Sequence, residues 1–389
     1  MAFKRTAHTL SGTLNITLIA TLIATLMGCS NNSIPDVIKI GAAQPLTGNK
    51  AGQGQDLLNG VKLAVAELNA SGFKVKGKSV TLELVAVDDR ADPKTGVEVA
   101  KQLVDAGVVA VVGHLNSGVS IAAAPVYAEK NIAQLAISTN PKFTALGLST
   151  TLRLVGNDIL QAKAIGSYTV NQLNAGKYAV ADDGTTYSKG LADGALAQLK
   201  LAKKEVVFNE SFDKDTVAFD GLAQKLKDGK VEVLITTQSD FQVIALIQAL
   251  QKINYTNIKI LGGDTLKTTL MFKVTGAVAG IYASSPILEA AEFASGKEFL
   301  AKYRTAYKID PEYAGHYTYD ATYAIAAAIK RAESTKPADI TAALRKMDLH
   351  APVTGSYRFD ATGEQRYGAI AIYNLGSGKW EPLIRSDAW

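Results

Sequence analysis

The chain has 389 residues, of which 41 are Lys or Arg and 36 are Asp or Glu, so its formal net charge is +5 at pH 7. This charge is mild, and no basic run is interleaved with aromatic residues, which argues against a nucleic-acid-binding protein. Hydrophobic residues make up 47% of the chain, which fits a globular protein.

The N-terminus has the pattern of an export signal. Lys4 and Arg5 precede a mostly apolar stretch, residues 14–27, which is too short and too interrupted for a good transmembrane helix. It ends in Leu-Met-Gly before Cys29, which resembles a bacterial lipobox. Cys29 is the only cysteine, so it has no disulfide partner in the chain.

We therefore interpret residues 1–28 as a lipoprotein signal peptide and residues 29–36 as a lipidated linker that tethers the fold to the membrane. An ordinary secretory signal with a chance cysteine is the alternative. In either case the protein is exported, to the periplasm or the cell surface. The sequence does not distinguish an inner from an outer membrane.

After the linker, apolar strands and amphipathic helices alternate. The predicted strands are 38–42, 80–87, 108–112 and 133–138, and the predicted helices are 57–68, one that starts at Asp92-Pro93, and 119–129. The run Val108 to Val112 is almost continuously apolar, as is typical of a strand buried on both faces of a parallel sheet. The order strand, helix, strand predicts an α/β fold.

The same alternation starts again after Gly156. The predicted strands are 177–181, 204–208, 231–236, 258–263 and 279–284, and the predicted helices are 159–173, 189–201, 217–227 and 241–253. Two α/β lobes of similar make-up are the simplest account, because the chain after the signal exceeds the usual size of one hydrophobic core. Later helices, 293–307 and 316–333, and a last strand, 368–375, could return to either lobe.

No catalytic or cofactor motif is complete. His114 and Ser117 are three residues apart, but no G-x-S-x-G motif surrounds Ser117 and no third group is identifiable. The few histidines form no metal-ligand pattern, and neither a P-loop nor a complete G-x-G-x-x-G follows a strand. We therefore expect no enzyme, no metal and no cofactor, and we read His114 as a hydrogen-bonded loop or core residue.

Polar loops at the ends of strands favour a binding site instead, because ligands of open parallel sheets lie beyond the carboxyl ends of the strands. In the first lobe these loops are Leu46-Thr47-Gly48, Asn116-Ser117-Gly118 and Ser138-Thr139-Asn140. The second precedes a helix N-terminus, which favours a negative charge. A carboxylate can be held there by hydroxyls and backbone N–H groups.

Two strands of the second lobe end in Gln238-Ser239-Asp240 and Gly263-Asp264-Thr265. An aspartate at such an end can hold an ammonium group, although helix capping is an equally simple role for it. A hydroxyl-lined anion site that faces an aspartate suits a zwitterion, such as an α-amino acid.

The chain resembles the leucine/isoleucine/valine-binding proteins, which are type I periplasmic binding proteins of ABC importers. The matching stretches occur in family order over nearly the whole chain after the signal: IKIGAAQPLTG, AVAELNASG, VDDRADPKTG, VVAVVGHLNSG, QLAISTNPKFT, ADDGTTYSKGLA, ILGGDTL and YTYDATYAI. The resemblance implies two Rossmann-like lobes with parallel sheets, joined by a three-crossover hinge. It places residues 37–156 and 287–362 in lobe one, and 157–286 and 363–389 in lobe two.

The resemblance also implies roles for single residues. Ser117 and Thr139 match residues whose hydroxyls hold the ligand carboxylate, and Ser138 matches a backbone contact. Asp264 matches an acidic residue that holds the amine, and Tyr187 matches a tyrosine of the cleft wall.

The chain departs from its relatives at several positions of the expected site. Gln53 and Gln238 stand where some relatives have cleft aromatics, and Asn116 and Ala91 stand where some have a disulfide pair. We include Gln53, Gln238 and Asn116 among the expected ligand-binding residues. These changes indicate a more polar pocket than one shaped for leucine, and Lys50 leaves room for an acidic or larger polar ligand.

The expected function is capture of an amino acid, branched-chain or a related polar one, between two lobes and its delivery to the permease subunits of an ABC importer. The alternatives are a different small ligand (an amide, a short peptide or an aromatic acid), a sensor that signals to a membrane partner, and a hydrolase that uses His114 and Ser117. The sequence does not identify the ligand.

Overall fold

A computed structural model gives the fold of residues 1–2, 34–173 and 175–386. The predicted signal peptide, the lipidation site Cys29 and most of the linker lie outside the described residues, so these remain predictions. Among the described residues, no helix combines the length and the apolar character needed to cross a membrane.

The first sheet has five parallel strands in the order β4-β1-β5-β6-β7. Their bounds are β1 (Val37–Gln44), β4 (Thr81–Asp88), β5 (Ala110–Gly113), β6 (Ala133–Ala136) and β7 (Thr151–Arg153). Strand β1 thus lies between β4 and β5, which are the next two strands of this sheet along the chain, so the strand order reverses beside β1. Such a reversal leaves a crevice at the carboxyl ends of the strands.

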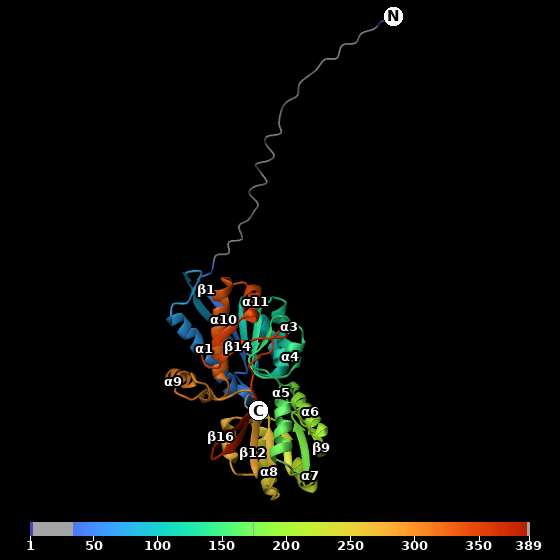
Figure 1. The fold of residues 1–389 in the computed structure, drawn as a ribbon. Coiled ribbons are helices and arrows are strands. Elements are labelled where there is room, and N and C mark those ends of the chain that lie inside the picture. The colour runs from blue at the N-terminus through green and yellow to red at the C-terminus, as the bar shows by residue number, and fades with distance from the viewer. Residues whose placement is uncertain (3–33, 174, 387–389) are drawn as a thin grey trace. The chain divides into compact units, whose positions relative to one another are not determined.

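Helices cover both faces of this sheet (Figure 1). One face packs against α1 (Ala51–Ala70), α10 (Gly315–Ala332) and α11 (Pro337–Lys346), and the other packs against α2 (Pro93–Asp105) and α3 (Ser117–Ala128). Strand β5 shows why helices cover both faces. Its residue Val111 belongs to the core under α2 and α3, whereas Val112 belongs to the core on the opposite face. Successive side chains of a strand point to opposite faces, so an unbroken apolar strand serves two cores.

The second sheet has seven strands in the order β16-β15-β12-β11-β10-β8-β9. Their bounds are β8 (Lys177–Asp182), β9 (Glu205–Ser211), β10 (Val233–Thr236), β11 (Lys259–Gly262), β12 (Gly280–Ser285), β15 (Ala371–Gly376) and β16 (Lys379–Arg385). The parallel strands β8 to β12 repeat the strand order of the first sheet. The last two strands are added antiparallel at the β12 edge.

Helices also cover both faces of the second sheet. The cores on its two faces are formed with α5 (Asp158–Tyr168) and α6 (Thr186–Leu201), and with α7 (Asp220–Asp228) and α8 (Asp240–Lys252). Cap residues fix several helix starts: Asp92 accepts a hydrogen bond from the N–H of Thr95 at 2.8 Å, and Ser239 forms a capping box on α8.

The remaining elements are short or peripheral. Helix α9 (Gly296–Tyr307) packs against α1 and α10, and α4 (Lys142–Ala145) follows β6. Two small hairpins and several single turns complete the chain: β2 (Lys74–Val75) with β3 (Lys78–Ser79), β13 (Asp348–Ala351) with β14 (Gly355–Arg358), η1 (Gly48–Lys50), η2 (Thr169–Leu173), η3 (Asp264–Leu266), η4 (Thr269–Val274) and η5 (Ala290–Glu292).

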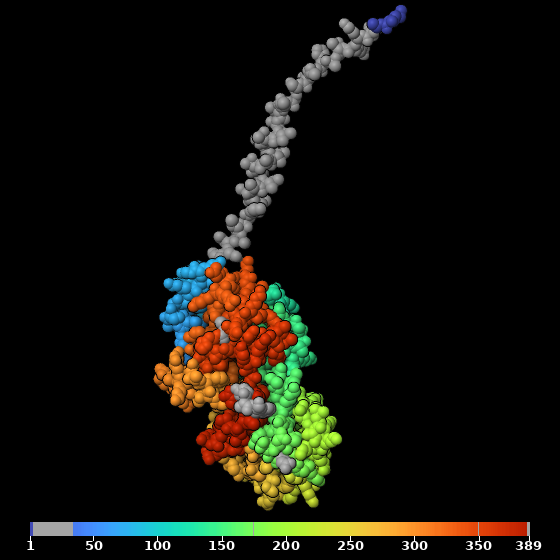
Figure 2. Space-filling model, in the orientation of Figure 1, coloured from blue at the N-terminus to red at the C-terminus, as the bar shows by residue number. Residues whose placement is uncertain are grey.

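The chain passes between the two sheets three times: after β7, after β12 and before β15. Figure 2 shows the orange-red segment of α10 and α11 among the blue and green segments of the first sheet, while the dark red final strands lie beside the second. The α/β class with two Rossmann-like sheets and three crossovers is therefore confirmed. The exact boundaries of the lobes stay predictions.

Several element predictions need correction. The helix expected from Phe293 begins only at Gly296, the helix expected from Val217 begins at Asp220, and the strand expected from Gly368 begins at Ala371. Strands β7 and β16, helices α4 and α11 and both hairpins were not expected. Except for β16, which has seven residues, each of the missed strands has no more than four residues, too few for a periodic pattern.

Candidate functional site

A small cavity lies at the carboxyl ends of strands from both sheets. It is closed on one side by loops after β1, β5 and β6, and on the other by segments that follow β8 and β11. Its lining residues are Lys50, Gln53, Leu115, Asn116, Ser117, Ile137, Ser138, Thr139, Tyr187, Asp264, Thr265 and Tyr313. The cavity thus lies at the strand-order reversals of both sheets, as the loop pattern predicts.

One wall of the cavity, lined by Ser117, Ser138 and Thr139, presents hydroxyls beside a helix N-terminus. Ser117 is the first residue of helix α3, and no acidic residue lies in the first turn of that helix. The Ser117 hydroxyl accepts a hydrogen bond from the backbone N–H of Asn140 at 3.2 Å, and the Ser138 hydroxyl is buried without a partner in the described part of the chain. Free N–H groups and unpaired hydroxyls at a helix N-terminus suit a carboxylate.

The facing wall carries the carboxylate of Asp264, in the η3 turn. Its Oδ1 accepts hydrogen bonds from the Tyr187 hydroxyl at 2.7 Å and from Nε2 of Gln161 at 3.1 Å. Its Oδ2 accepts one from the Tyr313 hydroxyl at 2.7 Å. Burial, reinforced by the charge of Asp264, raises the pKa values of both tyrosines well above the usual range, so both stay protonated and donate.

Tyr313 reaches this site from a distant part of the sequence. The buried carboxylate of Asp56, in α1, accepts hydrogen bonds from the N–H groups of Tyr313 at 3.0 Å and Gly315 at 2.7 Å. A Cβ on Gly60 of α1 would lie 1.9 Å from the carbonyl oxygen of Gly315, so α1 and α10 approach too closely there for any side chain. This close packing fixes the loop that presents Tyr313 to Asp264.

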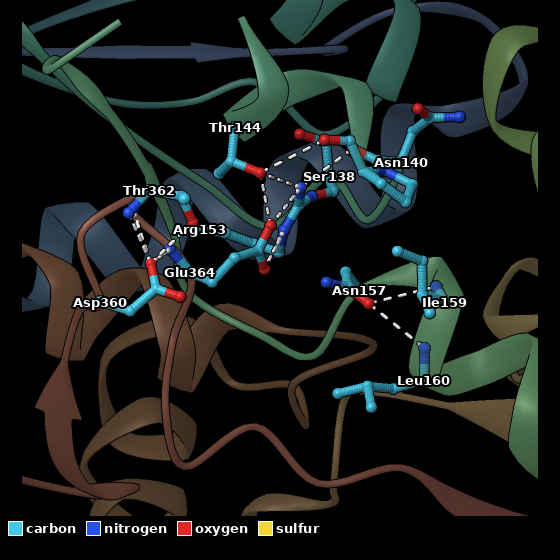
Figure 3. Close-up of polar contacts among 12 residues, drawn as sticks. Ser138, Asn140, Thr144, Arg153, Asn157, Ile159, Leu160, Asp360, Thr362 and Glu364 are labelled. Atoms are coloured by element: carbon cyan, nitrogen blue, oxygen red, sulfur yellow. Dashed lines mark hydrogen bonds and ion pairs between the residues drawn. The ribbon is translucent and has the colours of Figure 1, made fainter. Parts of the chain in front are cut away.

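A cluster under the Ser138–Asn140 loop centres on Arg153, which is fully buried at the end of β7. Its guanidinium donates to the carbonyl oxygens of Ser138 and Asn140, the latter at 2.9 Å. It also donates from Nε and Nη2 to the carboxylate of Glu364, at 3.0 and 3.1 Å. Figure 3 shows this cluster between the Ser138–Asn140 loop and the turn at Asp360, which accepts hydrogen bonds from the N–H groups after it.

Asp158 is a second buried acid close to the cavity. It is the first residue of α5, whose N-cap is Asn157 (Figure 3), and its oxygens have no hydrogen-bond partner of good geometry. Burial raises its pKa to about 8, and the charges of Asp264 and Glu364 act in the same direction. The Thr139 hydroxyl and Arg153 act in the opposite direction. Burial therefore favours the protonated, uncharged form of Asp158.

This raised pKa predicts a specific pH dependence. From its ordinary pKa of 3.8 up to about 8, Asp158 binds a proton in the folded state that the unfolded chain does not hold. Its contribution to the free energy of unfolding therefore falls as the pH rises through this window. We expect Asp158→Asn, which carries no charge, to be stabilised relative to wild type by an amount that grows from about pH 4 to about pH 8.

Urea denaturation of both proteins without ligand, at several pH values across this window, checks that prediction. Asp228→Asn, at the exposed end of α7, is the matched control and should show no such pH-dependent gain. A constant difference between Asp158→Asn and wild type at all pH values would contradict a buried, protonated Asp158.

Seven of the eight residues expected in the site line the cavity: Gln53, Asn116, Ser117, Ser138, Thr139, Tyr187 and Asp264. Gln238 is not among the lining residues; it is buried, and its Oε1 accepts a hydrogen bond from the Thr236 hydroxyl at 3.0 Å. Tyr313 and Gln161 were missed, because neither stands at a strand end. Lys50, noted only for its charge, is part of the lining.

His114 does not pair with Ser117. Its Nδ1 lies 2.7 Å from Oδ2 of Asp89 and its Nε2 lies 3.2 Å from the Tyr127 hydroxyl, all within the buried interior. The interpretation of His114 as a hydrogen-bonded core residue is thus confirmed. Among the residues that the structure describes, no group of three or more His, Cys, Asp and Glu side chains is arranged to hold a metal ion.

Comparison with known proteins gives a consistent result. Residues 37–379 match the family model described as periplasmic binding protein. The chain is 31% identical over 346 residues to a Leu/Ile/Val-binding protein homolog 2 of Brucella abortus, covering 88% of this chain and 91% of the relative. It is 32% identical over 367 residues to an amino acid binding protein of Pseudomonas aeruginosa, covering 92% of this chain and 95% of the relative.

Among solved structures, the fold is similar to the branched-chain amino acid transporter substrate binding protein LivJ of Streptococcus pneumoniae, in complex with isoleucine. The TM-score is 0.79 at 26% sequence identity, and the match covers 89% of this chain and 98% of the other.

Proposed function

The chain belongs to the periplasmic binding protein family, whose members are solute-binding proteins of ABC transporters and not enzymes, and from this premise we propose that it captures an α-amino acid between its two sheets. The relatives named Leu/Ile/Val-binding proteins and the isoleucine complex of the similar structure support an amino acid as the ligand. The ligand is branched-chain or a related, more polar amino acid.

The observation that carries this proposal is the pairing of two complementary walls in one cavity. Ser117, Ser138 and Thr139 offer hydroxyls and N–H groups beside a helix N-terminus, where a carboxylate is stabilised. Asp264 faces them with a buried carboxylate held by three donors, where an ammonium group finds its counter-charge. An α-amino acid carries these two groups on neighbouring atoms.

Each lobe contributes part of the ligand-binding site. We infer that lobe one comprises residues 37–156 and 287–362 and that lobe two comprises residues 157–286 and 363–389. The wall formed by Ser117, Ser138 and Thr139 then belongs to lobe one, whereas Asp264 and Tyr187 belong to lobe two. A ligand that contacts both lobes favours the state in which they are close, so affinity and closure are coupled.

Export, anchoring and delivery complete the proposal. The lone Cys29 after an apolar segment supports lipidation, which would tether the protein to the extracytoplasmic face of a membrane. Permease subunits of an ABC importer in that membrane would then receive the amino acid. Gln238, buried beside the site with its Nε2 unpaired, stays a candidate ligand contact.

A thermal-shift panel tests the ligand class. The purified protein is unfolded and refolded to remove carried ligand, and then screened with the common L-amino acids. We expect one chemical group of amino acids to raise Tm, because a ligand at about a hundred times its Kd adds about 2.7 kcal/mol to the free energy of unfolding.

Simple amines and simple carboxylic acids serve as controls, because each carries only one of the two groups that the walls recognise, and neither class should produce a comparable shift. A flat response to every amino acid would refute the proposed function.

A further inference from the structure

Lys50 presents an unpaired cation to the cavity. It ends the η1 turn after β1 and stands at the N-terminus of helix α1. Its Nζ is buried and has no hydrogen-bond or ion-pair partner among the residues that the structure describes, and the side chain lines the same cavity as Ser117 and Asp264. A buried ammonium group without a counter-charge is costly, so a negative group supplied by the ligand would relieve this cost.

Gln53, one turn further along α1, adds a second unpaired donor to this wall. Its side chain is buried and lines the cavity, and its Nε2 has no partner. The first turn of α1 contains no acidic residue, so its free N–H groups add partial positive charge beside Lys50. Toward the inner cavity this wall therefore offers hydrogen-bond donors and positive charge, while the Glu312 carboxylate, which lies against Gly52, lines the neighbouring cleft and not the inner cavity.

The aspartates near the mouth of the cavity do not supply the missing partner. Lys50 also lines a wider outer cleft, together with Asp92, Asp183, Asp213 and Asp215, and Asp92 accepts hydrogen bonds from the N–H and hydroxyl of Thr95. Asp183 accepts hydrogen bonds from Thr185, and the carboxylate of Asp215 pairs with Lys214 at 2.6 Å. Asp213 accepts a hydrogen bond from the N–H of Asp215. Each of these carboxylates is already bound within its own loop.

The groups common to all α-amino acids leave Lys50 unmatched. On the proposed function, the α-carboxylate is received by the wall of Ser117 and Thr139 and the ammonium group by Asp264, which leaves the ligand side chain to face Lys50 and Gln53 in the same cavity. A leucine side chain there would seal the Lys50 ammonium away from water without a partner. A side-chain carboxylate would neutralise it and accept charge-assisted hydrogen bonds from both residues.

Resting on the proposed function, we infer that the site selects an α-amino acid with an acidic side chain, and that Lys50 and Gln53 are the residues that determine this specificity. Lys50 lines both the inner cavity and the outer cleft, and on this inference it contacts the acidic group of the ligand side chain. The α-carboxylate of the acidic amino acid then meets the wall of Ser117 and Thr139, its side-chain carboxylate meets Lys50 and Gln53, and its ammonium group meets Asp264.

Calorimetric titration of the refolded protein tests the inference with matched ligand pairs: L-glutamate against L-glutamine, L-aspartate against L-asparagine, and L-leucine as the apolar reference. We expect wild type to bind one acidic amino acid about 10- to 100-fold more tightly than its amide and than leucine. Lys50→Met should remove most of this preference, because it weakens binding of the acidic amino acid far more than binding of its amide.

Two further variants control for fold and for general charge. Lys50→Gln gives a second, polar replacement in case Lys50→Met does not fold, and circular dichroism checks both. Lys273→Met removes the same charge from an exposed position in the neighbouring cleft, and should keep the acidic preference.

The outcomes separate this inference from the proposed function. Wild type that prefers leucine or the amides, or a Lys50→Met variant that loses affinity for acidic and neutral ligands alike, would overturn the inference and leave amino acid binding intact. A protein that binds no amino acid would overturn both.

Discussion

Arg153→Met is expected to lower the free energy of unfolding by about 3–5 kcal/mol, because removing one partner of a buried ion pair leaves the other uncompensated. Glu364 would lose both hydrogen bonds from the guanidinium, and the carbonyl oxygens of Ser138 and Asn140 would lose a donor. Methionine has a similar reach, so the effect would come from charge and hydrogen bonding and not from a large cavity. Chemical denaturation with linear extrapolation measures the loss.

A matched control is the exposed pair of Arg304 with Asp310, whose side chains are 58% and 65% accessible. Arg304→Met should cost less than about 1 kcal/mol, because exposed ion pairs contribute little. If Arg153→Met and Arg304→Met lowered the free energy of unfolding equally, burial of the ion pair would not be the reason for the cost of Arg153→Met. Glu364→Gln, which keeps an acceptor near the guanidinium, should fall between them.

Arg153→Met should also weaken ligand binding. Arg153 holds the loop that carries Ser138 and Thr139, and it joins this loop to Glu364 at the beginning of the last segment that enters the second sheet (Figure 3). The two partners are 211 residues apart in sequence. No local pattern could reveal their contact, so the sequence predicts the loop but not the group that fixes it.

The parts of the fold that could be predicted are those with a local physical cause. Strand β5 is recognisable because a strand with helices on both faces must be apolar on both, and α2 because Asp92 and Pro93 are favourable at a helix start. The direction of β15 is different. Whether a strand joins an edge parallel or antiparallel depends on the path of the chain, which its own residues do not encode.

The residues of the site can also be separated into those that the sequence predicts and those that it does not. Parallel sheets bring the ends of their strands to one edge, so the sequence predicts that Ser117, Thr139 and Asp264 lie close together. Tyr313 could not, because it belongs to a loop before α10 and reaches Asp264 only through the packing of α10 on α1. Gln238 differs from these residues: it follows a strand end, but its Oε1 accepts a hydrogen bond from the Thr236 hydroxyl, so its role as a ligand contact stays a prediction.

Asp264→Ala is expected to weaken binding of the amino acid by about 2–5 kcal/mol, or roughly 30- to 4,000-fold in Kd. The ligand ammonium would remain in a closed cavity without its counter-charge, and the hydroxyls of Tyr187 and Tyr313 would lose their shared acceptor. Because unpaired buried donors add to the cost, the loss should exceed that of an exposed charge pair. Titration calorimetry with the amino acid found in the screen measures it.

Asp240 provides the matched control, since it is the other aspartate expected at a strand end of the second sheet. Its carboxylate accepts a hydrogen bond from the Thr268 hydroxyl at 2.7 Å and does not line the inner cavity. Asp240→Ala should therefore reduce stability and leave Kd nearly unchanged, whereas Asp264→Ala should raise Kd strongly. If Asp264→Ala bound the amino acid as tightly as wild type, the ammonium group would have to be held elsewhere, and the buried acid Asp158, close to Asp264, would be the next residue to replace.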